Sequence, residues 1–248
     1  MDLGLKGRTA AVSGASRGLG FACAAALAGE GARVAICGRD AEKLEAAARR
    51  IDGEVVPVVA DLATDAGATA FVDSACEQLG GIDILVANAG GPAPGGFAST
   101  SLDAFRDAYQ LNVLSVIAMC QAAVVGMRDR HWGRVIAVTS MGARQPIPGL
   151  IASNTARAAT TAFLKTLARE IAADGVTVNS VQPGSHGTDR LKAMYGDDLS
   201  ALAADIPIGR LGVPADLGAI VAFLASEQAG FITGTAIPVE GGACLGLM

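Results

Sequence analysis

Short runs of β-branched and other apolar residues alternate along this chain with longer stretches rich in alanine. Apolar runs bounded by turn residues predict buried strands, and the longer stretches predict helices. The expected strands are Thr9–Ser13, Arg33–Cys37, Glu54–Val59, Ile84–Ala87, Arg134–Thr139, Thr177–Val181 and Ala236–Val239. The expected helices are Leu19–Gly29, Ala41–Arg50, Ala66–Leu79, Ser101–Arg130, Ser153–Ala173 and Ala215–Ala225.

This alternation predicts an α/β fold, a Rossmann-like, doubly wound parallel sheet of about seven strands flanked by helices. The composition agrees, because 51% of the residues are apolar and only 4% are aromatic, which suits a parallel sheet covered by close-packed helices. The 248 residues suit a single domain spanning 1–248. Ligands of such sheets bind beyond the carboxyl ends of the strands, so functional residues should follow the strands directly.

The least regular stretch is Gly184–Pro207, which is rich in Gly, Asp and Ser. Two interpretations of this stretch stay open, a mobile lid over a substrate and a plain surface loop.

Charge and cysteine content exclude several classes of protein. The net charge is −5 with no basic run, so we expect no nucleic-acid partner. No apolar run approaches the ~20 residues that span a bilayer, and no signal peptide opens the chain, so we expect a cytoplasmic protein without a membrane partner. The cysteines form no CxxC pair or zinc spacing, which predicts reduced, mostly buried thiols and no metal site. They are Cys23, Cys37, Cys76, Cys120 and Cys244.

A glycine-rich turn joins the first expected strand to the first helix. Gly14 permits a tight turn, Gly18 lets the backbone approach a pyrophosphate, and Gly20 lets the helix pack close to the sheet. The N-terminus of the helix would face the phosphate charge. This order of strand, turn and helix predicts a dinucleotide site. Its expected contacts in the turn are Gly14, Ser16, Arg17, Gly18, Leu19 and Gly20.

The end of the second strand bears on the choice of nucleotide. NAD sites usually place an acid there to bind the ribose 2′-OH, whereas here the first polar residue is Arg39. Together with Arg17, it could hold a 2′-phosphate, which favours NADP(H) and leaves NAD(H) as the alternative. The other interpretation is that Arg39 is solvated and that Asp40 only caps the next helix.

Over essentially its whole length, the sequence resembles the short-chain dehydrogenase/reductase family. The glycine turn resembles the family's TGxxxGxG motif with Ser13 in place of Thr, and Ile237–Gly242 resembles its closing PVDGG strand. Asn88–Gly90 resembles the end of its NNAG motif. The resemblance implies further cofactor contacts at Asp61, Leu62, Asn88, Ala89, Gly90, Pro183, Gly184 and Thr188.

The resemblance fails at the catalytic acid. Asn112 and Ser140 stand where the family keeps its catalytic Asn and Ser. The family's YxxxK motif would fall at positions 153 and 157, and this chain has Ser153 and Arg157 there. The pKa of a serine hydroxyl lies far above the value of about 10 for tyrosine, so Ser153 cannot be an ionising base. Ser153 would either take another direct catalytic role or cap a helix, and Arg157 could still donate hydrogen bonds to the nicotinamide ribose.

Few residues could replace the missing acid. His186 follows Pro183 and Gly184 beside the expected nicotinamide, and histidine suits general acid catalysis, although a loop histidine is commonly a surface residue. Arg144 could bind a substrate carboxylate or be solvated, and Tyr195 could enter from the lid or serve packing. His131 should lie on the surface at the far end of the sheet.

Two functions are therefore compatible with the sequence. One is an NADP(H)-dependent oxidoreductase acting on a small carbonyl or alcohol, in which Ser140 orients the oxygen and His186, water or the substrate handles the proton. The other is a nucleotide-binding protein of the same fold without ordinary redox turnover, such as a lyase, an isomerase or a regulatory subunit. Two long apolar helices and the pairing known in the family predict a homotetramer.

Overall fold

All the predicted strands are present in the computed structural model, which describes residues 2–247, and they form one parallel sheet of seven strands. The strands are β1 (Thr9–Val12), β2 (Arg33–Gly38), β3 (Val55–Val59), β4 (Ile84–Ala87), β5 (Gly133–Val138), β6 (Val176–Pro183) and β7 (Ala236–Val239). Their order is β3-β2-β1-β4-β5-β6-β7, so the chain reverses its direction across the sheet between β1 and β4. In open α/β sheets the ligand crevice lies at such a switch point.

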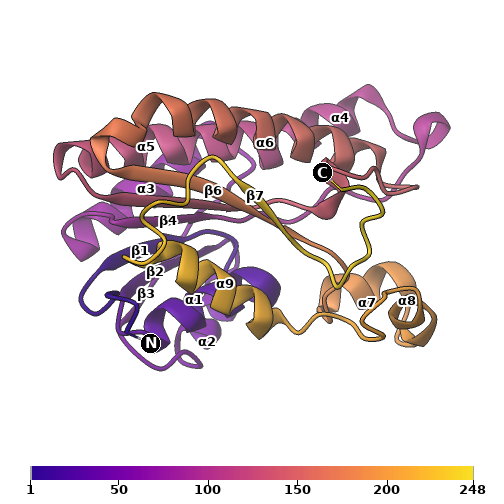
Figure 1. Cartoon of the computed structure of the whole chain (residues 1–248), viewed down its shortest axis with the longest axis horizontal. Helices are drawn as coiled ribbons and strands as arrows, with labels where there is room; N and C mark the ends of the chain where they lie inside the picture. Colours follow the sequence, from indigo (N-terminus) through magenta and orange to yellow (C-terminus); the bar gives the residue numbers. More distant parts are fainter. Residues whose placement is uncertain (1, 248) are drawn as a thin grey trace.

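Helices cover both faces of the sheet (Figure 1). They are α1 (Gly18–Gly29), α2 (Ala41–Ala48), α3 (Asp65–Leu79), α4 (Leu102–Tyr109), α5 (Ser115–Asp129), α6 (Ile151–Ile171), α7 (Asp189–Tyr195), α8 (Ser200–Ala204) and α9 (Pro214–Ala225). Helices α1 and α9 pack on one face, and α3, α5 and α6 pack on the other.

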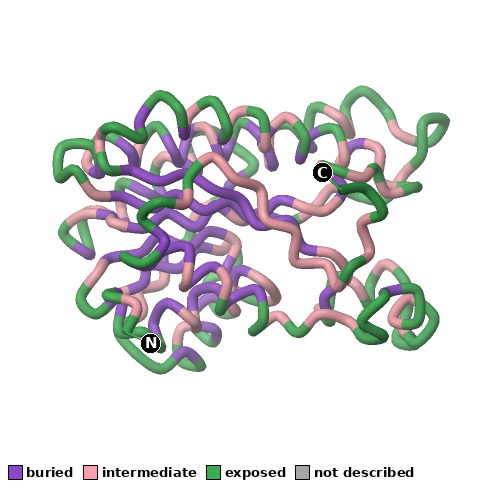
Figure 2. Tube along the Cα trace, in the orientation of Figure 1, coloured by how far each residue is buried: buried purple, intermediate pink, exposed green. Residues whose placement is uncertain are grey.

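The inner strands of the sheet are buried on both faces, as the purple centre of Figure 2 shows. Successive residues point to opposite sides, so Ala10 and Val12 join the core under α1 and α9 while Ala11 joins the core under α3 and α5. Strands buried on both sides carry no polar face, which is why they stand out in the sequence as continuous apolar runs.

The long helix predicted over Ser101–Arg130 is interrupted. A π-helical turn at Gln110–Leu114 separates α4 from α5. Within it, the Oγ1 hydroxyl of Thr160 on α6 donates a hydrogen bond of 2.6 Å to the backbone oxygen of Asn112. An extra residue in a helical turn leaves some backbone groups without a hydrogen-bond partner inside the helix. Here the backbone oxygen of Asn112 finds its partner in Thr160, which belongs to a distant segment. The local apolar pattern therefore did not reveal the interruption.

Helix α6 begins earlier than predicted. Its first residue is Ile151, so Ser153 lies within the first turn and the interpretation of Ser153 as a helix cap is wrong. The backbone before the helix pairs with the loop after β4, since Gly95 donates to Gly149 at 2.7 Å and Ile151 donates to Gly95 at 3.2 Å. This long-range pairing sets where the helix starts.

The segment predicted to be irregular, Gly184–Pro207, contains α7 and α8, so that expectation is wrong. Thr188 caps α7 by accepting a hydrogen bond from the Leu191 amide at 3.4 Å. Asp198 accepts one from the Ser200 amide at 3.0 Å, at the start of α8. These short helices lie beyond the carboxyl ends of the strands, at the lower right of Figure 1.

The helical stretch Leu102–Asp129 is long and apolar enough to cross a membrane by length and composition, with a mean hydropathy of 1.6. Half of that window is buried inside the protein, against the sheet and its neighbouring helices.

Candidate active site

The glycine turn after β1 has the geometry expected for a phosphate-binding loop. Gly14 and Gly18 have φ values of +58° and +63°, a region that favours glycine. A Cβ on Gly14 would lie 2.8 Å from the Asn88 backbone oxygen, and a Cβ on Gly20 would lie 2.6 Å from the Asn88 side-chain nitrogen. Only glycine can occupy these positions, and the turn leads directly into the N-terminus of α1.

Asn88 connects the ends of the two strands at the switch point. Its Nδ2 donates to the Gly14 oxygen at 3.0 Å. The Ser13 hydroxyl donates to the Asn88 oxygen at 2.7 Å and accepts from the Asn88 amide at 2.9 Å. Ser13, which replaces the family's Thr, therefore helps to hold the glycine turn against the end of β4.

The shape of this turn fits a dinucleotide pyrophosphate. A Cβ on Gly18 would lie 3.8 Å from the methyl carbon of Thr188. The loop after β6 therefore faces the glycine turn. Asp61 and Leu62 follow β3, where Asp61 is exposed and Leu62 is buried.

The arginines predicted to read a 2′-phosphate are both exposed. Arg17 lies 3.9 Å from Asp189, and Arg39 forms no ion pair or hydrogen bond within residues 2–247. Asp40 caps α2 by accepting a hydrogen bond from the Lys43 amide at 3.1 Å, so the cap predicted for it is confirmed. This carboxylate is thus held by the helix, while Arg39 is free to bind a ligand.

Ser140 follows β5, and its hydroxyl accepts a hydrogen bond of 3.0 Å from the Gly142 amide. A Cβ on Gly142 would lie 3.2 Å from the Ser140 hydroxyl and 2.5 Å from the Asn154 oxygen, so the two side chains converge there. Asn154 also holds the backbone of Ile147 through both of its amide atoms. Ser153 is partly exposed, and its hydroxyl makes no hydrogen bond in the described part of the chain.

Arg157 is buried, with only 6% of its surface exposed. Its guanidinium donates to the oxygen of Val138 at 2.9 Å and to that of Ala89 at 3.2 Å, which joins the carboxyl ends of β5 and β4. Burial, and to a smaller extent the charge of Arg190, lowers the pKa of Arg157 to about 10. At neutral pH it remains a buried cation.

Asn112 is fully buried in the π turn, where its Nδ2 donates to the Ala108 oxygen at 3.2 Å. Its Oδ1 has no partner among residues 2–247. Asn112 lines a cavity of about 150 Å³ together with Pro92 and Ala152. Buried polar atoms nearly always have a partner, so this oxygen suits a water molecule or a substrate group.

His186 is buried with 5% exposure, so the alternative that it is a surface residue is wrong. Its Nδ1 lies 3.1 Å from the Gly184 oxygen, and its Nε2 has no partner in the described chain. A Cβ on Gly212 would lie 2.6 Å from the ring, so a glycine there makes room for the histidine. Backbone pairing of His186 with Gly212 draws the loop inward, a contact that the local sequence could not show.

The three remaining candidates are His131, Arg144 and Tyr195. His131 is exposed before β5, as predicted. Arg144 donates to the Ala236 oxygen at 3.2 Å, so it braces β7. Tyr195 is 51% exposed at the end of α7.

The five cysteines are free. Burial raises the pKa of the Cys23, Cys37 and Cys120 thiols to about 12, so they are unreactive near neutral pH.

Two features near the site had no clear signal in the sequence. Arg190 donates to the Pro92 oxygen at 2.8 Å, and its guanidinium lies 2.6 Å from a Cβ position on Gly91. The C-terminal tail reaches the loop after Ser140, because the Leu245 amide donates to the Gln145 side chain at 2.7 Å. The one sign of the Arg190 contact in the sequence is that a basic residue stands two positions after Thr188.

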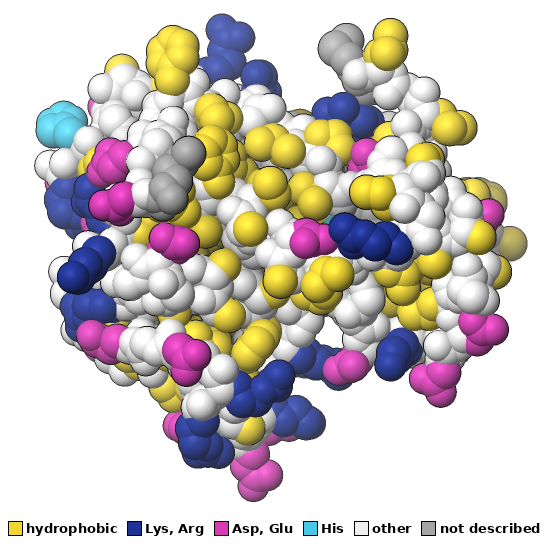
Figure 3. Space-filling view, turned by 60° about the horizontal axis from the view of Figure 1, so that its bottom comes forward, with side chains coloured by type: hydrophobic (Ala, Val, Ile, Leu, Met, Phe, Trp, Pro, Cys, Tyr) yellow, Lys and Arg dark blue, Asp and Glu magenta, His cyan; other side chains and the backbone are white. Residues whose placement is uncertain are grey.

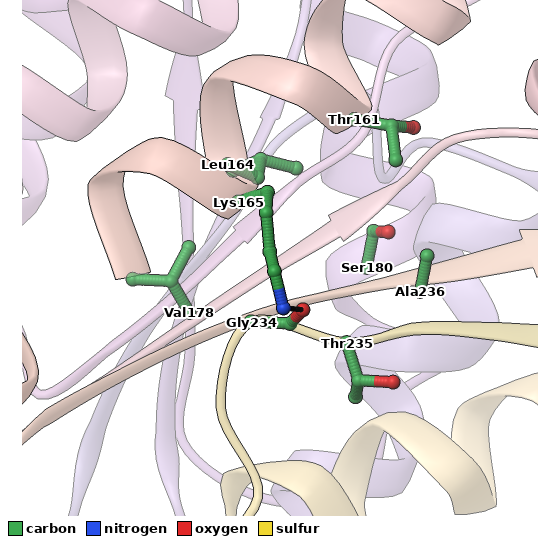
Figure 4. Close-up of a pocket in the computed structure, with 8 residues that line it drawn as sticks. All are labelled: Thr161, Leu164, Lys165, Val178, Ser180, Gly234, Thr235 and Ala236. Carbon is green, nitrogen blue, oxygen red and sulfur yellow. Dashed lines mark hydrogen bonds between the residues drawn. The ribbon is translucent and has the colours of Figure 1, made fainter. Parts of the chain in front are cut away.

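A separate cavity of about 170 Å³ lies between α6 and the strands β6 and β7 (Figure 4). Lys165 points across it and donates to the Gly234 oxygen at 2.7 Å. None of the predicted site residues lines this cavity.

Comparison with known proteins agrees with this geometry. The family described as enoyl-(acyl carrier protein) reductase matches residues 14–244. The chain is 34% identical over 240 residues to 3-oxoacyl-(acyl-carrier-protein) reductase FabG of Vibrio cholerae, which covers 97% of this chain and 98% of that protein. It is 34% identical over 244 residues to acetoacetyl-CoA reductase of Cupriavidus necator, which covers 96% and 99%.

Among solved structures, L-sorbose reductase from Gluconobacter frateurii, complexed with NADPH and L-sorbose, superposes with a TM-score of 0.94. It is 33% identical, and the match covers 100% of both chains. The fold, the glycine turn locked to Asn88 and these full-length matches agree. The chain belongs to the short-chain dehydrogenase/reductase family of oxidoreductases.

Proposed function

We propose that the protein is an NADP(H)-dependent oxidoreductase that interconverts a carbonyl compound and its alcohol. The main support for this proposal is the position of the Arg157 guanidinium. Its contacts with Ala89 and Val138 join the nucleotide end of the sheet, next to Asn88, to the strand end that precedes Ser140. A ligand held at the glycine turn and a substrate at Ser140 would therefore share one crevice.

The proposed preference for NADP(H) over NAD(H) rests on the two exposed arginines. Arg17 and Arg39 extend from the ends of β1 and β2, and Ser16 lies against Gly38 between them. Guanidinium groups bind phosphate oxygens by charge-assisted hydrogen bonds, whereas a ribose hydroxyl gains little from them. The NADPH bound to the sorbose reductase supports this choice.

The chain's residues would divide the binding between them. The glycine turn and the N-terminus of α1 would hold the pyrophosphate, while Asp61 and Leu62 would border the adenine. Asn88, Ala89, Gly90, Pro183, Gly184 and Thr188 would line the nicotinamide side. NADPH, when bound, supplies the hydride. Ser140 would orient the substrate oxygen, and Arg157 would donate hydrogen bonds toward the nicotinamide ribose.

We further propose that the site works without the family's usual acid, because Ser153 and Arg157 stand where Tyr and Lys are expected. Ser153 can donate a hydrogen bond but cannot ionise near neutral pH. Three sources of the proton remain: the unpartnered Nε2 of His186, a water molecule at Asn112 Oδ1, and the substrate itself. His186 is the one that mutation can test directly.

The segment with α7 and α8 is proposed as the substrate lid, since it begins at the loop that faces the glycine turn. We also propose a cytoplasmic homotetramer. Figure 3 shows a face on which apolar side chains gather over the middle, with most charged side chains nearer its margins. Exposed apolar residues include Leu102, Val125 and Phe231, which favours burial between subunits.

The alternative is a nucleotide-binding protein of this fold without redox turnover, which the missing Tyr and Lys favour. Two measurements separate these functions. Calorimetric titration with NADP⁺ tests nucleotide binding, and the oxidation of NADPH with a panel of ketones, aldehydes and oxo acids tests turnover. Binding accompanied by stoichiometric formation of alcohol supports the reductase. Tight binding with no product from any carbonyl supports the alternative.

A further inference from the structure

Two arginines bracket the short segment Ala89–Pro92 that follows β4. Arg157 reaches it from α6 and donates to the Ala89 oxygen at 3.2 Å. Arg190 reaches it from α7, donates to the Pro92 oxygen at 2.8 Å and lies against Gly91. The two guanidinium groups are thus held on one stretch of backbone, although they come from helices far apart in the sequence.

Neither of these cations is neutralised by the protein. Within residues 2–247, the ion pairs include neither Arg157 nor Arg190. Arg190 is exposed, whereas Arg157 is buried, and burial of an unpaired cation is unfavourable. The second positive charge nearby adds to this cost for Arg157. Accordingly, the pKa of Arg157 is lowered by its burial and by Arg190. Each guanidinium also has five N–H donors, more than its backbone contacts use.

Arg190 and the residue before it make different contacts. The preceding residue, Asp189, lies 3.9 Å from Arg17 in the glycine turn. Arg190 instead contacts Gly91 and Pro92, and Pro92 borders the cavity that Asn112 lines. Arg190 therefore contacts a residue that borders this cavity, and its own side chain is not among those that line it.

We propose that Arg190, with the buried charge of Arg157 behind the same backbone segment, binds a carboxylate on the substrate, so that the preferred substrates are oxo acids and hydroxy acids. This inference rests on the proposed function, because it places the carboxylate next to the carbonyl that Ser140 would orient. A carboxylate would supply the missing negative charge and accept hydrogen bonds from the Arg190 guanidinium. Arg190 would then be a specificity-determining residue.

Binding can be measured without turnover by calorimetry on the protein saturated with NADP⁺. The probes are acetoacetate and pyruvate, each compared with its uncharged methyl ester. Wild type should bind the acids more tightly than the esters. Arg190→Met should weaken binding of the acids by about 10- to 100-fold, the usual effect of losing a charged hydrogen bond, and leave the esters unchanged. Arg190→Lys should retain part of the preference.

Arg128→Met is the matched control, because Arg128 is an exposed arginine paired with Asp174 at the opposite end of the strands. It should bind all the probes as wild type does. Equal binding of acids and esters by wild type would overturn the proposal, and so would an undiminished preference in Arg190→Met. A loss of NADP⁺ affinity in Arg190→Met with unchanged acid binding would show that Arg190 binds a cofactor phosphate and not a substrate carboxylate.

The outcome is separable from that of the proposed function. If no carbonyl is reduced but acids still bind through Arg190, the reductase fails and the carboxylate site remains. If carbonyls are reduced but acids and esters bind equally, the reductase remains and the carboxylate site fails.

Discussion

The guanidinium of Arg157 on α6 donates a hydrogen bond of 2.9 Å to the backbone oxygen of Val138, the last residue of β5. This contact leaves the positive charge buried without a carboxylate partner among residues 2–247. Because burial lowers the pKa of Arg157 to about 10, the folded protein releases this proton more easily than the unfolded chain does. Below pH 10, both states keep the proton and the full cost of burial is present.

Stability should therefore depend on pH through Arg157. As pH rises through the folded-state pKa, the unfolded chain holds more protons at this site, so the contribution of Arg157 to stability increases. The free energy of unfolding of wild type, relative to Arg157→Met, should rise above pH 9 by at most about 1.4 kcal/mol per pH unit. Urea unfolding of both proteins from pH 7 to 10.5 measures this difference. A difference that is constant with pH would contradict the assignment.

Cofactor preference should depend on Arg39. NADP⁺ should bind more tightly than NAD⁺, and Arg39→Ala should remove most of the difference while NAD⁺ affinity stays unchanged, because only the 2′-phosphate contact is lost. Calorimetric titration of both nucleotides tests this. Arg49→Ala, at the other end of α2, is the control and should keep the preference. Equal affinities in wild type would refute the role of the arginines.

Restoring the family's Tyr and Lys should show whether the chain has lost its proton donor or uses a different one. If Ser153 and Arg157 are remnants of a reductase, the double variant Ser153→Tyr with Arg157→Lys should gain activity on simple ketones, because the phenol can supply a proton. If the site now uses another proton source, the added ring should occupy substrate space and native activity should fall. NADPH oxidation by the single and double variants decides between them, with NADP⁺ affinity as the control for folding.

His186 should reveal whether its unpartnered Nε2 takes part in proton transfer. His186→Ala should lower kcat by ~10²–10⁴, the usual contribution of a positioned general acid, with little change in cofactor affinity. The pH–rate profile should also change, because a group that transfers a proton has been removed. His186→Gln tests packing, because it keeps a polar side chain in the space beside Gly212. A wild-type pH profile in His186→Ala would leave water or the substrate as the proton source.

The assembly should be a homotetramer, or failing that a dimer, because exposed apolar side chains such as Val125 and Phe231 gain from burial between subunits. Light scattering at micromolar concentration measures the mass. Val125→Glu on α5 should shift the mass downward if this helix is at an interface, and Lys6→Glu, an exposed polar position, should not. A monomeric wild type would contradict the prediction.

The sequence by itself determined the sheet and the glycine turn. Strands such as β1 and β5 are buried on both faces, so their apolar runs are continuous and visible without any partner. The turn is equally local, because Gly14 and Gly18 adopt left-handed conformations that few other residues accept. The proposal that Ser153 and Arg157 replace Tyr and Lys rests on spacing and resemblance alone.

Only the tertiary structure decided how charges and buried polar atoms are arranged around the site. The burial of His186 depends on pairing with Gly212, and the π turn at Asn112 depends on Thr160, each from a distant segment. Arg157 and Arg190 are likewise adjacent only because α6 and α7 both reach the segment after β4. Such contacts leave no periodic trace in the sequence, since they join single residues across the fold and do not repeat along one element.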